Sequence, residues 1–426
     1  MISDDRSAWP DAPGLGPLGD GRCASAAFRP KTVAELADVV KAEAALGGAI
    51  YPQGGRLALD YGLPPGRPGA AVDLTALADV VDYPHADMTV TVQAGMTVAA
   101  LQALLDEHRQ RLLFEVPEPD RATIGGALAT AVCGPRRYGL GRPRDSIIGV
   151  SFMTAAGVEV DGGGRVVKNV AGYDFPKLLT GSLGTLGVIT QATLKVRPKP
   201  TASALIWLTA PTVEPLDAHV AALNASSVRP TAVELLNPSA ATHIVGLPGL
   251  KTRLWTLVVG IEGDPDSVAW QVDEFRRETG ADFEVVRDED EVEPLWAGLL
   301  DFQTGPAPLV CSASLRPSRV AAFLAGLDPE RWAAKAHAGD GVVWLNALEG
   351  WTEDQAVEAV ESARAVAVRD GGNLVVAYCP TAWKPRLRVW GEPRGDWAFG
   401  RKVKQALDPD GLMNPGRFAG EEALRK

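Results

Sequence analysis

The segment from Arg165 to Pro198 constrains the fold of this chain more than any other stretch of its sequence. The alternating pattern from Thr190 to Val196 predicts a strand. Four glycines precede this strand in the same segment: Gly172, Gly181, Gly184 and Gly187. Glycine lets a backbone approach a neighbour where any side chain would block it. The segment therefore predicts a glycine-rich loop that lies against a flat ligand and leads into a strand.

The size and charge of the chain limit its class. With 426 residues, 46% of them hydrophobic, the chain can bury the cores of two domains. A formal net charge of −11 argues against the basic face that nucleic-acid binding requires. No run of about 18 apolar residues occurs, and the first residues lack the basic start and apolar core of a signal peptide. We expect a cytoplasmic protein that meets the inner face of a membrane only through partners.

The cysteines give no sign of a metal centre. The four of them contain no C-x-x-C pair: Cys23, Cys133, Cys311 and Cys379. This pattern offers no visible ligand set for zinc or an iron–sulfur cluster and is typical of reduced cytosolic thiols.

Periodicity predicts a mixture of helices and strands in the first half of the chain. Residues 1–27 are rich in Gly and Pro with little periodicity, which predicts a loose lead-in. Thr32 and Glu35 then form a capping-box pattern that begins a helix. Further along, Met88–Gln93 predicts a strand and Thr97–His108 a helix.

Composition changes at the Pro198-Lys199-Pro200 sequence, beyond which ten of the eleven tryptophans lie. We place the domain boundary there, which gives a first domain at 28–200, a second at 201–395 and a C-terminal segment at 396–426. Strand and helix patterns in the second domain occur at Leu205–Leu208, Leu254–Ile261, Val342–Leu345, Asn373–Tyr378, Asp266–Thr279 and Thr352–Arg369.

The loop from Pro52 to Gly62 follows a short predicted strand and contains Gly54 and Gly55. Successive backbone N–H groups around two glycines can bind an anionic diphosphate without a lysine. The spacing matches neither the P-loop nor the dinucleotide fingerprint. A Gly-Gly pair after a strand is more often only a turn, so both interpretations stay open on these residues alone.

A row of small residues runs through the segment Pro117–Arg144: Thr123, Gly125, Gly126, Ala129 and Thr130. Such a row leaves room for an aromatic ring system beside the backbone, whereas the simpler interpretation is the tightly packed start of a helix. The same segment contains Arg136, Arg137, Arg142 and Arg144. These arginines either approach cofactor phosphates or a partner, or form a solvated basic loop.

Taken together, these segments resemble the FAD-binding domain of the vanillyl-alcohol oxidase/para-cresol methylhydroxylase superfamily. After the glycine-rich loop, its motifs occur here in order: V-D-L at Val72–Leu74, T-V-T-V-Q-A-G at Thr89–Gly95, A-T-I-G-G at Ala122–Gly126 and G-S-x-G-T-L-G at Gly181–Gly187. The resemblance implies an FAD cofactor and an α+β fold. In that fold a two-subdomain FAD-binding domain is joined to a second α+β cap domain with an antiparallel sheet.

The resemblance also implies a role for each glycine-rich segment. Residues 54–57 are expected to hold the diphosphate, 123–130 to run beside the ring system, and 184–189 to pack on the ribityl and adenine parts. The expected cofactor-binding residues are Pro52, Gln53, Gly54, Gly55, Arg56, Leu57, Pro117, Thr123, Gly125, Gly126, Thr130, Gly134, Tyr138, Gly139, Gly184, Gly187, Val188 and Ile189.

Three positions depart from the family pattern. Gln53 and Arg56 stand where the wider superfamily often has Arg and Gly, and Leu183 stands where many catalytic relatives have Glu.

Two longer stretches are similar to one branch of the superfamily. Residues 164–189 are similar to the FAD-binding subunits of bacterial glycolate oxidases. The C-terminal Ala406–Phe418 resembles the tail of the D-lactate and glycolate oxidising branch, which returns to the flavin domain. This resemblance implies two partners, a catalytic flavin subunit and an iron–sulfur subunit of a glycolate oxidase complex.

The segment His337–Trp344 reads H-A-G-D-G-V-V-W. Relatives that oxidise D-2-hydroxy acids have H-A-G-D-G-N-L-H there and a later E-H-G, whose His and Glu residues bind a divalent metal that polarises the hydroxy acid. Here Val342 and Trp344 offer no ligand atoms, and no E-H-G follows. His337 is either a remaining base near a flavin or, more simply, a structural histidine in a turn. We expect no metal and assign no catalytic residue.

Three basic residues alternate on a stretch with a strand-like pattern: Lys384, Arg386 and Arg388. They either bind a substrate carboxylate through charge-assisted hydrogen bonds or line a solvated edge strand.

The sequence therefore predicts an accessory FAD-binding subunit of a glycolate oxidase, an FAD-dependent oxidoreductase acting on a D-2-hydroxy acid. Two alternatives stay open: a stand-alone FAD-dependent dehydrogenase of another hydroxylated substrate, and a flavin-free assembly scaffold.

Overall fold

The computed structural model describes residues 16–165, 172–244, 253–417 and 419. The chain forms two compact units. The first unit contains the residues up to Val132, Arg142–Lys199 and the residues from Pro393 onward; the second contains Cys133–Gly141 and Pro200–Glu392. The predicted domain change near residue 200 coincides with a border between units, and the C-terminal segment of the first unit begins at Pro393, where the sequence predicts 396.

The segment Cys133–Gly141 departs from the predicted organisation, which assigns it to the first domain. It contains the short helix α4 (Arg137–Leu140). The N–H of Gly139 donates to the carbonyl of Thr231 (3.0 Å) in the second unit. This packing explains why the segment belongs to the second unit, although residues on both sides of it belong to the first.

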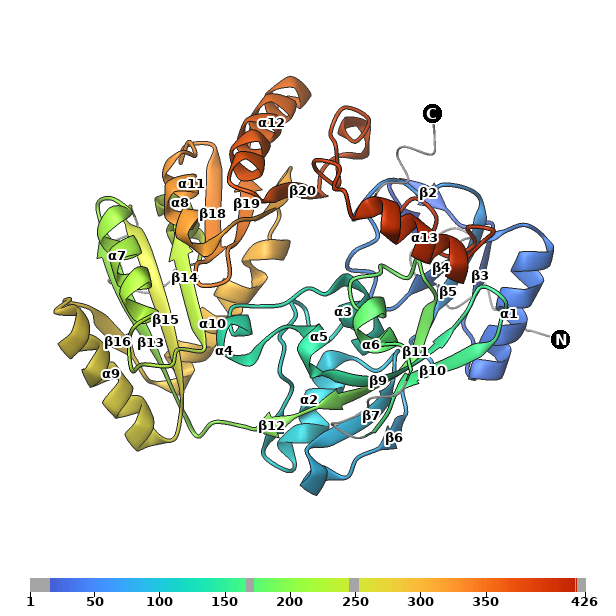
Figure 1. Cartoon of the computed structure of the whole chain (residues 1–426), viewed down its shortest axis with the longest axis horizontal. Coiled ribbons are helices and arrows are strands. Elements are labelled where there is room, and N and C mark those ends of the chain that lie inside the picture. The colour runs from blue at the N-terminus through green and yellow to red at the C-terminus, as the bar shows by residue number, and fades with distance from the viewer. Residues whose placement is uncertain (1–15, 166–171, 245–252, 418, 420–426) are drawn as a thin grey trace. The chain divides into compact units, whose positions relative to one another are not determined.

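A three-stranded parallel sheet with the order β3-β5-β4 forms one part of the first unit. Its elements are β3 (Ala26–Phe28), β5 (Gly69–Asp73), β4 (Ala49–Gln53) and the covering helix α1 (Val33–Ala45) (Figure 1). Thr32 Oγ1 accepts a hydrogen bond from the N–H of Glu35 at the start of α1, as the capping pattern predicts. Leu36 and Val40 of α1 then bury themselves against the sheet.

The residues ahead of α1 contain more structure than their weak periodicity predicts. Pro17–Gly19 (β1) and Arg22–Cys23 (β2) form an antiparallel pair, and β3 follows within the segment expected to be a loose lead-in. Short strands like these carry too few residues to give a period in the sequence.

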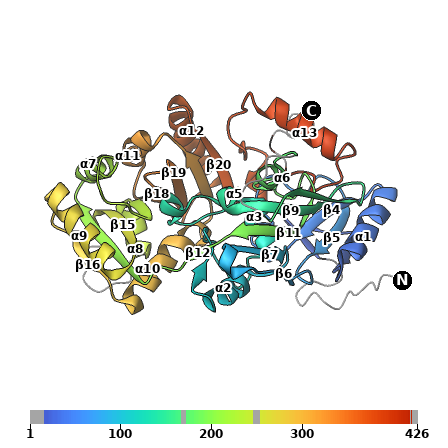
Figure 2. The same cartoon turned by 60° about the horizontal axis from the view of Figure 1, so that its bottom comes forward.

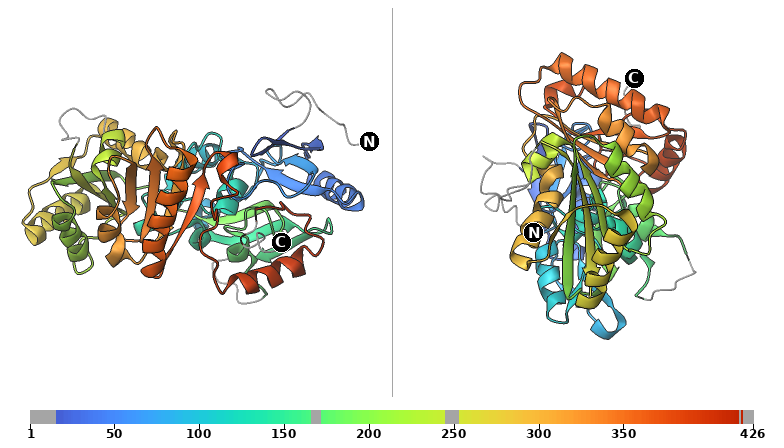
Figure 3. Two further views of the ribbon diagram at one scale, coloured as in Figure 1. Left: turned by 90° about the horizontal axis from the view of Figure 1, so that it is seen from above. Right: turned by 90° about the vertical axis from the view of Figure 1, so that its left-hand side faces the viewer.

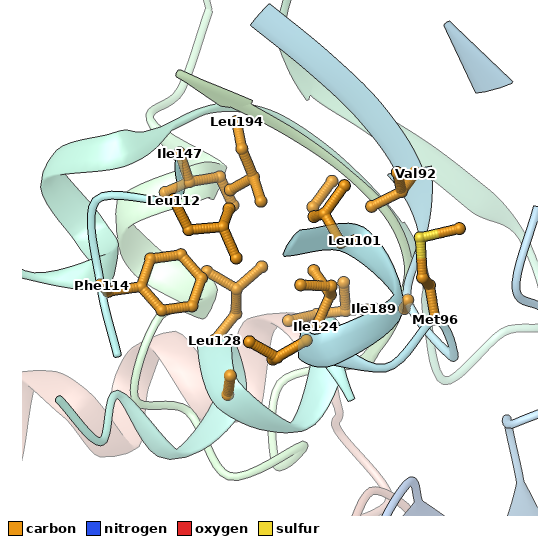
Figure 4. Packing of buried hydrophobic residues seen from close by; sticks show 14 of the residues in the cluster. Val92, Met96, Leu101, Leu112, Phe114, Ile124, Leu128, Ile147, Ile189 and Leu194 are labelled. Atoms are coloured by element: carbon orange, nitrogen blue, oxygen red, sulfur yellow. The ribbon is translucent and has the colours of Figure 1, made fainter. Parts of the chain in front are cut away.

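A five-stranded antiparallel sheet with the order β10-β9-β11-β7-β6 forms the other part of the first unit. Its strands and covering helices are β10 (Glu159–Gly163), β9 (Ile147–Met153), β11 (Val188–Lys195), β7 (Thr89–Gln93), β6 (Val80–Asp82), α2 (Val98–Asp106) and α3 (Ile124–Thr130). The side chains of Val92, Leu101, Leu128 and Leu194 come from four of these elements and meet in one apolar core (Figure 4). In β7 the alternate residues Val90 and Val92 face this core, as the period of two requires.

The remaining elements of the first unit are short, apart from the C-terminal helix. They are β8 (Gln110–Arg111), β12 (Arg197–Pro198), a 3-10 turn at His85–Asp87, α5 (Pro143–Ser146), α6 (Phe175–Leu179) and α13 (Trp397–Leu407). Val403 and Leu407 of α13 pack against the apolar core of the five-stranded sheet. In the left view of Figure 3, α13 is the red helix beside the green strands.

An eight-stranded antiparallel sheet forms the second unit, with the order β16-β13-β15-β14-β18-β19-β17-β20. The strands are β16 (Glu284–Val286), β13 (Ala202–Ala210), β15 (Trp255–Gly263), β14 (Ala232–Leu236), β18 (Trp332–His337), β19 (Val342–Ala347), β17 (Val310–Ser314) and β20 (Asn373–Tyr378). The antiparallel sheet and the mixed first unit confirm the predicted α+β fold class.

Helices cover both faces of this sheet. They are α7 (Glu214–Leu223), α8 (Pro238–Ile244), α9 (Pro265–Thr279), α10 (Glu289–Asp301), α11 (Val320–Ala325) and α12 (Glu353–Arg369). Figure 2 shows α7, α11 and α12 on one side of the sheet and α8 and α10 on the other. None of the helices in the described part of the chain is long and apolar enough to cross a membrane.

The strand-like pattern through Lys384, Arg386 and Arg388 is wrong as a prediction of structure. These residues follow a 3-10 turn at Thr381–Trp383 and lie in irregular backbone. Arg386 pairs with Asp354 (2.7 Å), and Arg388 pairs with Glu361 and Glu392. The arginine charges thus meet carboxylates of the same unit.

Candidate functional site

The loop after β4 packs closely against the start of α3. A Cβ atom added to Gly54 would lie 2.1 Å from Thr123 Oγ1, and one added to Gly55 would lie 1.9 Å from the carbonyl oxygen of Arg121. No real Cβ sits so close to another atom, so glycine is required at both positions. The structure therefore brings together two of the three segments that the sequence assigns to the cofactor.

Helix α3 begins at Thr123, whose Oγ1 accepts a hydrogen bond from the N–H of Gly126 (3.2 Å). The N–H of Gly125 donates to the carbonyl of Ala94 (2.7 Å), and a Cβ on Gly125 would lie 2.8 Å from the Ala94 Cβ. The hydroxyl of Thr130 donates back to the Gly126 carbonyl (2.9 Å). The small residues thus begin a tightly packed helix and also border the glycine-rich loop, while room for a ring system beside them stays a prediction.

The third segment lies against the other two. A Cβ on Gly184, whose φ is +69°, would lie 2.7 Å from Pro52 Cγ. The N–H groups of Gly181 and Leu183 donate to the carbonyls of Leu128 (2.9 Å) and Ala129 (2.8 Å) near the end of α3. We call the three segments 52–57, 117–131 and 181–187, taken together, the cradle.

The last predicted residues of this segment have a different role from the glycines. Val188 and Ile189 are 1% and 5% exposed and belong to the apolar cores of the first unit. A Cβ on Gly187 would lie 2.7 Å from Phe152 Cδ2. These three residues pair with or pack on β9, and their contact with a cofactor stays a prediction. Pro117 is likewise buried, whereas Leu57 is 37% exposed.

Strained backbone is concentrated at the cradle. Arg56, Glu118, Ala131 and Leu183 all have φ between +48° and +59°. Non-glycine residues adopt this region at a cost, and such residues cluster at ligand-binding sites.

Two buried polar atoms at the cradle have no hydrogen-bond partner among the described residues, Gln53 Oε1 and Ser182 Oγ. Gln53 is 3% exposed, and its amide N–H donates to the carbonyl of Pro17 (2.7 Å). Buried polar atoms normally have a partner, so these two are placed to contact a polar ligand. Together with the glycine backbone and the strain, they fit a cofactor with a diphosphate and a polyhydroxyl chain, such as FAD.

Arg56 is held by an acidic side chain of the sheet beside the loop. Its guanidinium lies 3.4 Å from Asp73 Oδ2, and Asp73 Oδ1 accepts hydrogen bonds from the N–H and hydroxyl of Thr75. Burial lowers the pKa of Arg56 from its ordinary value, although attraction to Asp73 opposes that change.

Gly134, Tyr138 and Gly139 lie in the second unit, and their contact with a cofactor stays a prediction. A Cβ on Gly139 would lie 2.7 Å from Thr231 Cα, and a Cβ on Gly339 would lie 2.1 Å from Tyr138 Cε2. Gly139 and Gly339 thus allow α4 to pack closely against other residues of the second unit.

The arginines of the same stretch have acidic partners. Arg136 Nε lies 2.7 Å from Glu262 Oε1, and its guanidinium lies 3.9 Å from the centre of the Trp296 ring. Arg137 Nε lies 3.3 Å from Asp340 Oδ2. Arg142 pairs with Asp145 (3.4 Å), and the positive charge of Arg144 favours the charged form of Asp174. The prediction of a solvated basic loop is wrong for Arg136 and Arg137, which pair with acidic residues of the second unit.

His337 belongs to a buried ionic cluster that the sequence does not reveal. Its Nδ1 lies 2.6 Å from Glu234 Oε1, and Lys335 Nζ lies 3.4 Å from Glu234 Oε2. All three side chains are at most 1% exposed. Lys335 Nζ also donates to the carbonyl of Leu299 (2.7 Å). Glu234 and Lys335 were missed because residues 232–236 and 332–337 do not form a motif; only the pairing of β14 with β18 brings them together.

Burial and charge act in opposite directions on this cluster. Burial raises the pKa of Glu234, but the charges of His337 and Lys335 outweigh it and hold that pKa below its ordinary value. Burial lowers the pKa of His337; attraction to Glu234 opposes this, and repulsion from Lys335 adds to it. We infer a neutral imidazole whose Nδ1–H donates to a charged Glu234 carboxylate.

The residues around His337 do not fit a divalent metal. No group of three or more His, Cys, Asp or Glu residues in the described ranges is arranged to hold an ion. Val342 lies opposite His337 in the strand pair, and Trp344 lies opposite Lys335. The ammonium of Lys335 supplies a positive charge beside the one histidine, and it would repel a cation there.

The C-terminal tail contributes residues that sequence reasoning did not assign. Asn414 Nδ2 donates to the carbonyl of Leu183 (2.6 Å), and Lys404 Nζ donates to the carbonyl of Thr185 (2.6 Å). The tail motif predicts the return of this segment to the first unit but does not indicate which side chains contact the cradle.

Comparison with known families matches most of the chain. The family model described as the FAD binding domain matches residues 24–163. The model described as the C-terminal domain of FAD linked oxidases matches residues 199–375 and 390–418.

Named relatives cover the chain to different extents. D-2-hydroxyglutarate dehydrogenase of Xanthomonas citri pv. viticola is 28% identical over 91% of this chain and 88% of the relative. Glycolate oxidase subunit GlcE of Escherichia coli is 39% identical, but over only 32% of this chain and 40% of the relative. Glycolate oxidase subunit GlcD of Bacillus subtilis is 24% identical over 88% of this chain and 85% of the relative.

Among solved structures, alkyldihydroxyacetonephosphate synthase shares the fold. It has a TM-score of 0.67 and 17% sequence identity over 92% of this chain and 77% of its own.

Proposed function

Since the chain belongs to the family of FAD-linked oxidases, we propose that it is an accessory FAD-binding subunit of a complex that oxidises a small 2-hydroxy acid such as glycolate. One contrast carries this proposal: three glycine-rich segments pack closely at the cradle, whereas no group of three or more His, Cys, Asp or Glu residues in the described part of the second unit is arranged to hold a metal ion. When bound, FAD accepts two electrons from an oxidation and can pass them on singly.

The residues of the cradle divide the binding of FAD among them. The backbone N–H groups around Gly54 and Gly55 would hold the diphosphate, because a loop without side chains at these positions can approach an anion closely. The start of α3, with Thr123 and Gly126, would border the ring system. Gly184 and the buried Ser182 hydroxyl would hold the ribityl chain.

The buried cluster in the second unit favours an accessory role. A cation whose charge is already balanced by a carboxylate of the protein attracts a substrate carboxylate less strongly, and a metal needs several ligand atoms. Lys335 and His337 share the carboxylate of Glu234, and Arg137 is paired with Asp340. The charges of this cluster therefore balance one another within the protein.

The names of two relatives support a complex. GlcE and GlcD are both called glycolate oxidase subunits. We propose that the partners of this chain are a catalytic flavin subunit and an iron–sulfur subunit, that the complex is cytoplasmic, and that contact with the inner face of a membrane is made through those partners.

The test is an anaerobic reduction. The purified chain, loaded with FAD, is mixed with glycolate, D-lactate or D-2-hydroxyglutarate, and flavin absorbance is followed. We expect a yellow protein whose absorbance does not decrease without partner subunits. The Xanthomonas citri relative serves as a positive control with D-2-hydroxyglutarate. Rapid bleaching of the isolated chain would overturn the accessory role, and failure to take up FAD would favour a flavin-free scaffold.

A second candidate is a stand-alone dehydrogenase of a 2-hydroxy acid. It is favoured by the match to the Xanthomonas citri enzyme, which extends over both units of the chain. A screen of hydroxy acids and alcohols with an artificial electron acceptor separates the two candidates, because only a stand-alone enzyme turns over without partners.

A further inference from the structure

We propose that the C-terminal segment Lys404–Asn414 sets the affinity for FAD by fixing the spacing between two segments of the cradle, with Asn414 as the positioning residue. This inference rests on the proposed function, because it assumes that residues 52–57 and 181–187 hold FAD. We call Lys404–Asn414 the clasp.

The clasp extends the small parallel sheet beside β4. The N–H of Ile50 donates to the carbonyl of Leu412 (2.9 Å), and the N–H of Asn414 donates to the carbonyl of Ile50 (2.8 Å). Met413 between them forms a parallel bridge with Ile50 and is fully buried. The clasp therefore holds the strand that leads directly into residues 52–57.

The side chain of Asn414 reaches the opposite segment of the cradle. Its Nδ2 donates to the carbonyl of Leu183 (2.6 Å), while the N–H of Leu183 donates to the carbonyl of Ala129 (2.8 Å). Leu183 has a φ of +54°, so its backbone is held in an unfavourable conformation by bonds on both sides. Asn414 itself has a φ of +44°, a region that Asn tolerates better than most residues.

A buried lysine fixes the turn that carries Asn414. Lys404 Nζ donates to the carbonyls of Thr185 (2.6 Å) and Met413 (2.9 Å) and to the carboxylate of Asp408. Asp408 in turn accepts hydrogen bonds from the N–H groups of Leu412 and Met413, both at 2.8 Å. All three ammonium protons of Lys404 thus have acceptors. The clasp is a satisfied network that contacts the cradle at residues 183 and 185 and contacts β4 at residue 50.

Asn414 therefore links two parts of the first unit. Its backbone bonds to Ile50 in β4, the strand that leads into residues 52–57, and its side chain bonds to Leu183 of the cradle. Without the side-chain bond, Leu183 keeps its bond to Ala129 and Thr185 keeps its bond to Lys404, but the link from Asn414 to residues 181–187 is lost. The loss of one buried hydrogen bond to a backbone carbonyl is expected to weaken FAD binding about tenfold.

The experiment compares Asn414→Gly and Asn414→Asp with the unmodified full chain. Glycine keeps the positive φ without strain and removes only the side chain; aspartate keeps the shape but replaces the donor with a carboxylate. Flavin is removed, and the dissociation constant for FAD is measured by fluorescence. The rise in the thermal unfolding temperature on adding FAD is measured in parallel. We expect weaker binding and a smaller FAD-induced rise in both variants.

Two controls separate the outcomes. Asn224→Ala changes an exposed asparagine after α7 and is expected to bind FAD normally. Gly55→Ala forces a Cβ into the Arg121 carbonyl and is expected to abolish tight binding. If Gly55→Ala binds FAD normally, the cradle is assigned wrongly and the proposed function fails with it. If only Gly55→Ala weakens binding, or if the Asn414 variants unfold earlier with an unchanged FAD-induced rise, the clasp proposal is overturned.

Discussion

At the scale of single residues, His337 is the clearest case of a side chain whose role depends on its neighbours. The sequence identifies it as the one histidine left from a metal motif. The structure adds Glu234 at 2.6 Å and Lys335 beside it, both fully buried. Because the partners lie on a different strand or belong to no motif, the ionic cluster was not predictable from the sequence.

The lowered pKa of His337 makes stability depend on pH. Below about pH 6.5 the unfolded chain binds a proton at this residue that the folded chain does not, so the free energy of unfolding falls as the pH decreases, by up to about 1.4 kcal/mol per unit. In the His337→Asn variant, the contribution of this residue to the pH-dependent fall in the free energy of unfolding should disappear. Urea unfolding at about pH 7.5 and about pH 5.5 measures it. The control is His243→Asn, at an exposed position, and equal decreases in both variants would contradict the prediction.

The Glu234–Lys335 pair should show strong coupling between two substitutions. Glu234→Leu leaves the buried ammonium of Lys335 without its counter-charge, which is expected to cost about 3–5 kcal/mol of stability. Adding Lys335→Met removes the unpaired charge, so the double variant should be more stable than Glu234→Leu alone. Urea unfolding of all four proteins completes the cycle, and additive effects would show that the pair is not coupled.

At the scale of elements, the sequence predicts those that repeat a clear period or carry a cap. Helix α1 begins after its N-cap Thr32, α12 begins after the capping box of Thr352 and Gln355, and the patterns at β15 and β20 mark real strands. Strand β14 is buried along its whole length, so it shows no alternation. Strand β18 is also wholly buried, yet it contains Lys335 and His337, which in the sequence resemble surface residues.

Part of the cradle was predictable from the sequence. Its glycines mark close backbone contacts, which are visible in the sequence because no other residue fits. The contributions of Asn414 and Lys404 were not, because long-range pairing places them there. Predicted positions 166–171 of the flavin-like segment lie outside the described residues.

Contact between two cradle segments should be sensitive to one methyl group. Gly184→Ala brings a Cβ to 2.7 Å from Pro52 Cγ and should weaken FAD binding by at least about fivefold. Gly280→Ala is a matched control, since Gly280 also has a positive φ, +61°, but has open space around it. Both substitutions place an alanine at a positive φ, so they share that conformational strain. An equal FAD affinity in the two variants would show that the contact between Gly184 and Pro52 does not matter for binding. Equilibrium dialysis with FAD provides the comparison.

At the scale of the whole molecule, the chain crosses between its two units more often than a two-domain plan requires. Cys133–Gly141 leaves the first unit and packs on the second, and the residues from Pro393 return to the first. Each unit therefore depends on residues far away in the sequence, although each has its own sheet and apolar core.

A chain that ends at Glu392 should lose the stability of the first unit selectively. It would lack Leu412 and Met413, each at most 4% exposed, and the α13 residues that pack on the five-stranded sheet. Burial of each such side chain contributes about 1.5–3 kcal/mol. Calorimetry should show the second unit unfolding near its usual temperature, with the transition of the first unit moved far down or lost. A parallel loss in both units would contradict the division described here.

The position of Met413 also bears on the order of events during synthesis. Met413, which bridges to Ile50, is separated from it in the sequence by the strands of the second unit. Domains that form during translation generally do so from the N-terminal end. In this protein the small parallel sheet near the N-terminus therefore gains its contact with Met413 only after the strands of the second unit have been made.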